Sequence, residues 1–177
     1  MEKIVEVIAK EIFIDSLPAG YTTIARARET FRPYIDSDFK NLDLDEEQRA
    51  SKRIEVNVYE LKKNANFFQM FTSLSNDLNK LCLTQDQIVN FCKNHSKHFV
   101  QNGGGTFFLS KKKNQSKNYF FKFLDHFFKI FSRKNSEFFV VRAIARSCGL
   151  GVDIICFEFV YVWRAEDSYR LVAPVTI

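Results

Sequence analysis

The sequence has no hydrophobic run long enough to cross a membrane. Its longest weakly charged apolar stretch, residues 154–163, contains Glu158 and is about half the ~20 residues that a membrane-spanning helix needs. The N-terminus carries glutamates where a secretory signal has basic residues before a long apolar stretch. We therefore expect a cytoplasmic protein with no transmembrane segment.

Cysteines are few, and none belongs to a closely spaced pair. The four are Cys82, Cys92, Cys148 and Cys156. This spacing favours reduced thiols that serve as small apolar residues. Cys92, His95 and His98 follow a C-x2-H-x2-H pattern, but on a continuous helix residue 98 is turned about 120° away from residue 92. One ion could not easily contact all three, so we expect no metal and no cofactor.

Glycines are also scarce, at 6 of 177 residues, and their order excludes a phosphate-binding loop. Residues 103–105 are three consecutive glycines that follow a predicted helix and precede a predicted strand. A phosphate loop has the opposite order, from strand through glycines into a helix N-terminus. We expect these glycines to end a helix.

Positive charge, by contrast, is concentrated in one segment. Residues 110–134, the basic segment, hold eight Lys or Arg against Asp125 alone, a net +7 in a chain whose total is +5. The cations on either side of its aromatic stretch are candidate nucleic-acid contacts: Lys111, Lys112, Lys113, Lys117, Arg133 and Lys134. Codon bias is the competing explanation, because Lys, Asn and the 20 phenylalanines all have AT-rich codons.

Hydrophobic spacing predicts a mainly helical N-terminal half. Ile4, Ile8 and Ile12 lie four residues apart, which is typical of an amphipathic helix over residues 2–13. Further expected elements are helices near 23–31, over 67–81 and from Thr84 to the glycines, and a strand over 54–61.

The C-terminal half contains strand patterns. We expect strands over residues 106–109 and 168–175 and a β-hairpin over 137–163, with a helix at 119–131. If the hairpin is symmetric about Gly149, Phe139 and Phe157 share one buried face. Glu158 then lies diagonal to Arg142, close enough for a cross-strand ion pair.

These elements predict an α+β fold in one domain, residues 1–177. A mainly helical part, roughly 1–102, would pack on a sheet part, roughly 103–177, that contains a basic insertion at 111–135. The sheet would be an antiparallel meander of about four strands, with the aromatic helix inserted after the first.

Four runs of the chain are similar to a known group of proteins. ARETFRPYIDSDFKN, VYEL, FFQMFTSLSNDLNKLCLTQDQIVNFCKNH and TFFL resemble small bacterial proteins of unknown function. The resemblance covers roughly residues 27–110 and, more loosely, 137–174. It implies a short turn in place of residues 111–135, which makes those residues an insertion, and it implies no activity.

We expect a non-catalytic binding module that contacts nucleic acid or an acidic protein surface through residues 111–134. No nucleophile, acid and base fall into a catalytic pattern. Two alternatives stay open. The first is an enzyme with a dispersed site around Cys92, His95 and Glu158. The second, less favoured, is a membrane-surface protein that uses the aromatic helix at 119–131.

Overall fold

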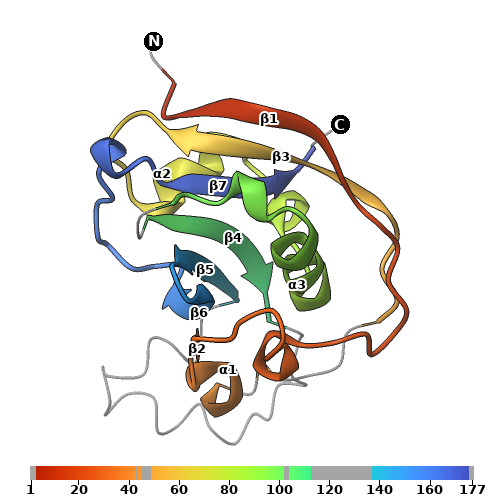
Figure 1. Ribbon diagram of the computed structural model, residues 1–177. Helices are drawn as coiled ribbons and strands as arrows, with labels where there is room; N and C mark the ends of the chain where they lie inside the picture. The colour runs from red at the N-terminus through yellow and green to blue at the C-terminus, as the bar shows by residue number, and fades with distance from the viewer. Residues whose placement is uncertain (1–2, 43, 45–48, 102–103, 113–136, 176–177) are drawn as a thin grey trace, which may run out of the picture.

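The computed structural model describes residues 3–42, 44, 49–101, 104–112 and 137–175 (Figure 1). The strands form one mixed sheet with the order β1-β3-β7-β4-β5-β6-β2. They are β1 (Val5–Ile14), β2 (Tyr34–Ile35), β3 (Ile54–Leu61), β4 (Gly105–Lys111), β5 (Phe138–Arg146), β6 (Gly149–Cys156) and β7 (Arg170–Pro174). The helices are α1 (Asp38–Asn41), α2 (Phe67–Thr72) and α3 (Gln85–Asn94), with short 3₁₀ turns η1 (Ile24–Arg26), η2 (Leu78–Leu81), η3 (Ser96–His98) and η5 (Ala165–Asp167).

The predicted α+β arrangement is wrong. The N-terminal half contributes β1, β2 and β3 to the sheet, so it is not mainly helical. Nor is the sheet a four-stranded antiparallel meander, because seven strands of the described residues take part and two of their pairs, β4 with β7 and β2 with β6, are parallel.

Residues 2–13 were misassigned because their spacing fits two structures. Side chains four residues apart lie on one face of a helix and also on one face of a strand. In the structure this segment forms β1, which pairs antiparallel with β3. Two register shifts interrupt the pairing, and Glu11 has a φ of 56° near the second. Such bulges change which residues face inward, and they hide the simple alternation of a strand.

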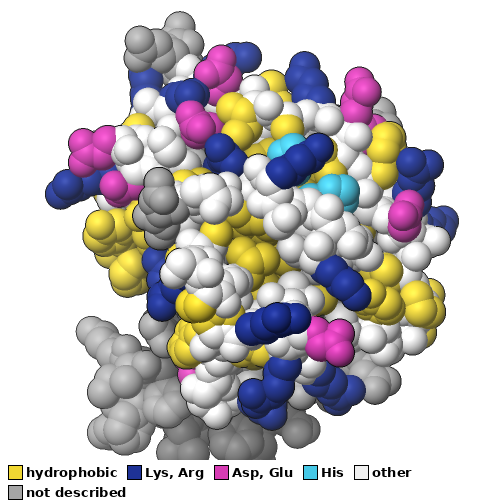
Figure 2. Space-filling view, viewed as in Figure 1, with side chains coloured by type: hydrophobic (Ala, Val, Ile, Leu, Met, Phe, Trp, Pro, Cys, Tyr) yellow, Lys and Arg dark blue, Asp and Glu magenta, His cyan; other side chains and the backbone are white. Residues whose placement is uncertain are grey.

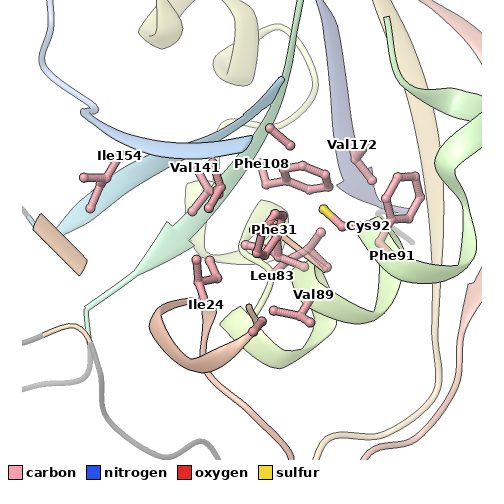
Figure 3. Packing of buried hydrophobic residues seen from close by; sticks show 14 of the residues in the cluster. Ile24, Phe31, Leu83, Val89, Phe91, Cys92, Phe108, Val141, Ile154 and Val172 are labelled. Carbon is pink, nitrogen blue, oxygen red and sulfur yellow. The ribbon is translucent and has the colours of Figure 1, made fainter. Parts of the chain in front are cut away.

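Buried side chains cover both faces of the sheet. On one face, α3 and the segment around η1 pack over Phe108, Val141 and Val172 (Figure 3). On the other face, α2 and Trp163 pack over Phe107. Figure 1 shows α3 and α2 on opposite sides of the sheet. The central strand β4 is therefore buried over nearly its whole length.

Two helix starts were predicted correctly from capping residues. Asn66 and Gln69 form a capping box at the start of α2, and the Gln87 side chain accepts a hydrogen bond from the Thr84 N–H at 3.0 Å at the start of α3. The helix predicted over 67–81 is shorter than expected, because α2 ends at Thr72 and a separate turn, η2, follows.

The hairpin exists, but its predicted register is wrong. Phe139 pairs with Cys156, and Arg146 pairs with Gly149, so the turn is Ser147-Cys148 rather than five residues centred on Gly149. This difference moves Phe157 to the face opposite Phe139, although both are buried. Arg142 consequently stands opposite Asp153, and Glu158 lies beyond the end of β6.

We predict that Phe107→Ala destabilises the protein by about 3–5 kcal/mol, the usual effect of removing a fully buried aromatic ring. Phe107 has no exposed surface and packs on Phe67, Trp163 and Tyr169. Urea unfolding followed by Trp163 fluorescence measures the change. Phe159→Ala is the matched control, because Phe159 is 46% exposed, and it should lose less than about 1 kcal/mol. Equal losses in the two variants would contradict the burial described for the sheet.

Candidate nucleic-acid interface

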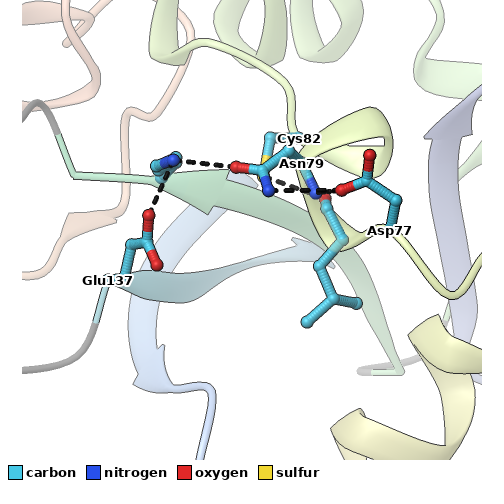
Figure 4. A network of polar contacts seen from close by, with 6 residues as sticks. Asp77, Asn79, Cys82 and Glu137 are labelled. Atoms are coloured by element: carbon cyan, nitrogen blue, oxygen red, sulfur yellow. Dashed lines mark hydrogen bonds and ion pairs between the residues drawn. The ribbon is translucent and has the colours of Figure 1, made fainter.

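Of the predicted contact residues, the structure describes Lys111 and Lys112. Lys113, Lys117, Arg133 and Lys134 lie outside the described residues, as does the predicted helix at 119–131. The Lys111 ammonium lies 2.7 Å from the Glu137 carboxylate and donates to Asn79 Oδ1 at 2.8 Å (Figure 4). Asn79 is held in turn by Asp77. Lys111 thus joins β4 to η2, and its charge is balanced locally.

The three residues of the alternative dispersed site have separate surroundings. Cys92 lies on α3 with its sulfur pointing into the core, toward Phe108 (Figure 3). His95 follows the last residue of α3, and its ring packs on Phe91. Glu158 follows β6 and accepts a hydrogen bond from the Cys156 thiol at 2.8 Å. These contacts do not form the hydrogen-bonded chain of nucleophile, base and orienting acid that covalent catalysis needs.

Burial also makes two of the thiols poor nucleophiles. It raises the pKa of the Cys82 thiol to about 12 and raises the pKa of the fully buried Cys92 thiol further still. The thiolate is the reactive form of cysteine, so both groups are unreactive at neutral pH. Cys148, in the turn between β5 and β6, is exposed.

We predict that iodoacetamide labels Cys148 first in the folded protein at mildly alkaline pH, because this thiol is exposed. Cys82 and Cys92 should react only when denaturant opens the fold. Peptide mass mapping after timed labelling measures the order of reaction. Native Cys92 reacting as fast as Cys148 would restore the enzyme alternative.

The arginines of β5 and β7, which are Arg142, Arg146 and Arg170, do not form one phosphate-binding group, because they do not all lie on one face of the sheet. Arg142 Nε donates to Asp153 Oδ1 at 3.0 Å, and a second bond joins Nη2 to Oδ2. Burial acts to lower the Arg142 pKa, but the hydrogen bond and charge of Asp153 raise it overall. Gly105 is required beside this pair, because a Cβ there would lie 2.8 Å from Arg142 Cδ. Arg170 lies on the opposite face, where Nη1 donates to the His98 carbonyl at 2.7 Å.

A cluster of cations does form over α3, from two segments far apart in the sequence. Residues 24–33 pack against α3 through Ile24, Ala27 and Phe31, which are buried in the same core as α3 residues. The Ile24 N–H donates to the buried Gln85 Oε1 at 3.1 Å, and Gln85 Nε2 donates to the Leu44 carbonyl. Gln85 thereby fixes this segment against the N-terminal end of α3.

The residues between these buried anchors point outward. We define the basic face as five exposed cations: Arg26, Arg28, Arg32, Lys93 and Lys97. Glu29 is the only carboxylate in residues 24–33, and residues 88–100 contain none, so the two segments carry a net charge of +4. Figure 2 shows Lys and Arg side chains gathered over α3 and η1. A shallow groove between the segments is lined by residues that include Arg32 and Lys93.

Most of the charge on the basic face is not neutralised by neighbours. Within the described residues, Arg28, Arg32, Lys93 and Lys97 take part in no ion pair. By contrast, Lys62, Lys111, Arg142 and Arg164 each have a carboxylate within 4 Å. These four cations can therefore bind an anion without first breaking an ion pair to another described residue.

A second unusual surface lies between β6 and η5. We define the apolar strip as four consecutive exposed residues: Phe159, Val160, Tyr161 and Val162. Val160 is 84% exposed, and the rings of Phe159 and Tyr161 stack with their centroids 6.0 Å apart. The strip follows Phe157, whose ring lies 6.0 Å from that of Phe138 at the base of the basic segment.

The described part of the chain was also searched for metal-binding groups and for membrane-spanning helices. No group of three or more His, Cys, Asp or Glu side chains there could hold a metal ion. In the same residues no helix is both long enough and apolar enough to span a membrane.

Sequence reasoning missed the basic face because it counted charge along the chain. The available signal was the alternation in residues 24–32, where Ile24, Ala27 and Phe31 separate the three arginines. That pattern indicates that the arginines are exposed on one packed segment. It does not show that Lys93 on α3 and Lys97 on η3 belong to the same face of the molecule.

The comparisons with known proteins give no family for this chain. No family model, curated protein or solved structure matches it. The resemblance of residues 27–110 to small bacterial proteins stays a prediction, and function must be argued from the surfaces described above.

Proposed function

We propose that this protein is a non-catalytic binding module for nucleic acid, and that its basic face contacts the phosphate backbone. The observation that carries the proposal is a set of four exposed cations, Arg28, Arg32, Lys93 and Lys97, that form no ion pair within the described part of the chain. Clustered Lys and Arg side chains on one face are the usual electrostatic footprint of a nucleic-acid-binding protein, and such side chains contact backbone phosphates.

The chemistry of the face predicts how the protein binds. Lysine and arginine contacts to phosphates release condensed counterions, so affinity falls steeply as salt rises and depends little on base sequence. Arg28 and Arg32 can each form two parallel hydrogen bonds to a phosphate, whereas the lysines act as point charges.

The basic segment is a second candidate contact for the same ligand. Its net charge of +7 is the largest local charge in the sequence. Lys112 lies at its start, where the backbone N–H donates to the Glu137 carbonyl at 2.9 Å. Lys113, Lys117, Arg133 and Lys134 lie outside the described residues, so the proposal is tested on the basic face, whose residues are all described.

We predict that Lys93→Glu combined with Lys97→Glu weakens binding of a fluorescent single-stranded oligonucleotide about tenfold at about 50 mM salt. The slope of log affinity against log salt should become shallower by about 1.4, because each contact to a single strand contributes about 0.7. Fluorescence anisotropy at several salt concentrations measures both quantities. The melting temperature should stay nearly unchanged, because both side chains are exposed.

The matched control is Lys63→Glu combined with Lys80→Glu, which makes the same change in net charge. Lys63 precedes α2 and Lys80 lies in η2, elements that pack on the other face of the sheet. This control should keep most of the affinity and salt slope. Equal losses in the two variants would mean that only net charge matters, and absence of salt-sensitive binding by the wild type would refute the proposal.

The apolar strip favours a second function, association with an anionic membrane surface. Exposed aromatic and aliphatic side chains on a chain with basic surface residues suit the boundary between headgroups and acyl chains. Phe159 and Tyr161 would enter that boundary while lysines contact the headgroups.

We predict for this second function that Phe159→Ser combined with Tyr161→Ser reduces sedimentation with phosphatidylserine vesicles at least several-fold, with oligonucleotide affinity unchanged. Vesicle co-sedimentation measures the effect, and Phe68→Ser is the control, because Phe68 is 60% exposed on α2. If the wild-type protein does not sediment with these vesicles, the membrane function is excluded.

A further inference from the structure

Two histidines lie at one end of the basic face because of a change in helix type. The α3 helix ends at Asn94, and the 3₁₀ turn η3 runs from Ser96 to His98. The His98 N–H donates to the His95 carbonyl at 3.0 Å. In 3₁₀ geometry, residues three apart lie nearly above one another, so both imidazoles project on the same side.

The positions of these rings are set by packing on the core. Both rings lie against Phe91, with centroid distances of 5.2 Å for His95 and 6.4 Å for His98. The two imidazole centroids are themselves 6.4 Å apart. Figure 2 shows the two histidines on the surface with a Lys or Arg side chain between them. They are partly exposed, and solvent or a ligand can reach them.

Cations surround this pair. The charged groups that act on His98 are Lys97 on η3, His95 beside it and Arg170 on β7, and none of them is a carboxylate. Arg170 fixes η3 through its bond to the His98 carbonyl. A site with this composition favours an anion, and its positive charge increases when the imidazoles take up protons.

We propose that His95, Lys97 and His98 form a phosphodiester-binding subsite of the basic face that binds more tightly as pH falls. This inference rests on the proposed function, because the ligand is the same nucleic-acid backbone. It adds a pH response that lysines and arginines alone would not give.

The sign of the pH response follows from linkage. Burial, followed by the charges of Lys97, His95 and Arg170, lowers the pKa of His98 below its ordinary value of 6.5, so the free protein holds this imidazole neutral at pH 7. A bound phosphodiester stabilises the charged form and raises that pKa. Binding therefore takes up protons, and affinity rises as pH falls from neutral through the ordinary imidazole value of 6.5.

The test uses a fluorescent oligothymidylate about twelve nucleotides long, within the span of typical single-strand sites. Neither its phosphodiesters nor its bases change charge between pH 7.5 and pH 5.5, so any pH effect belongs to the protein. We expect the wild type to bind about tenfold or more tightly at the lower pH. His95→Asn combined with His98→Asn should remove most of this gain, so that the variant binds with nearly the same affinity at the two pH values.

His126→Asn is the matched control, because His126 is the third histidine of the chain and is not one of the three residues of the proposed subsite. It should keep the full pH response. A direct measurement comes from the imidazole proton resonances of His98, whose pKa should rise when the oligothymidylate is added.

The outcomes separate the two proposals. Wild-type binding of equal strength at both pH values would overturn the histidine subsite and leave the basic face intact. A pH response that persists in the double histidine variant would also overturn it. Failure of the wild type to bind at either pH would refute the proposed function and this inference together.

Discussion

Burial of strand β4 on both faces is the constraint on which the rest of the structure depends. Its side chains alternate between two cores, with Phe108 packed on the α3 side and Phe107 on the α2 side. A strand in this position needs neighbours on both edges, and β5 and β7 supply them. Other elements must also pack over the apolar side chains on each of its faces, and α3 and α2 do so. The basic face exists because α3 and residues 24–33 form one of these covers.

This arrangement explains why the two surfaces of interest differ. On the α3 side, buried anchors alternate with exposed arginines, so the cover is tightly packed beneath and charged outside. On the other side, Trp163 is buried against Phe67 and Phe107, and the chain that leads to it carries the exposed apolar strip. The first surface suits a polyanion and the second suits an apolar partner or a lipid boundary.

Sequence patterns predicted those parts of the fold that local chemistry decides. The strand at 54–61, the start of α3 at a capping box, the β4 run and the terminal strand were all identified. Each depends on short-range alternation or on capping residues. The N-terminal strand was not identified, because isoleucines four apart fit a helix equally well and the bulge near Glu11 breaks the alternation. The hairpin register failed because Gly149 was taken as the centre of the turn, although it belongs to β6.

Topology and the charged surface could not be predicted in the same way. Nothing local indicates that β7 inserts between β3 and β4, or that two strand pairs are parallel. The basic segment stood out because three of its lysines are consecutive, whereas Arg32 and Lys93 lie 61 positions apart in the sequence and line one groove only in the folded protein. Linear charge counts therefore detected one basic region and missed the other.

The central claim is that exposed, unpaired cations over α3 are the contact surface for nucleic acid. Its most direct test is a ¹H–¹⁵N NMR titration of the full chain with a short single-stranded oligonucleotide. We predict that the shifted amide resonances are concentrated in residues 26–32 and 93–98, with little change around α2 and η2. Shifts confined to the α2 side of the sheet or to the apolar strip, or no shifts at any ratio of oligonucleotide to protein, would contradict the claim.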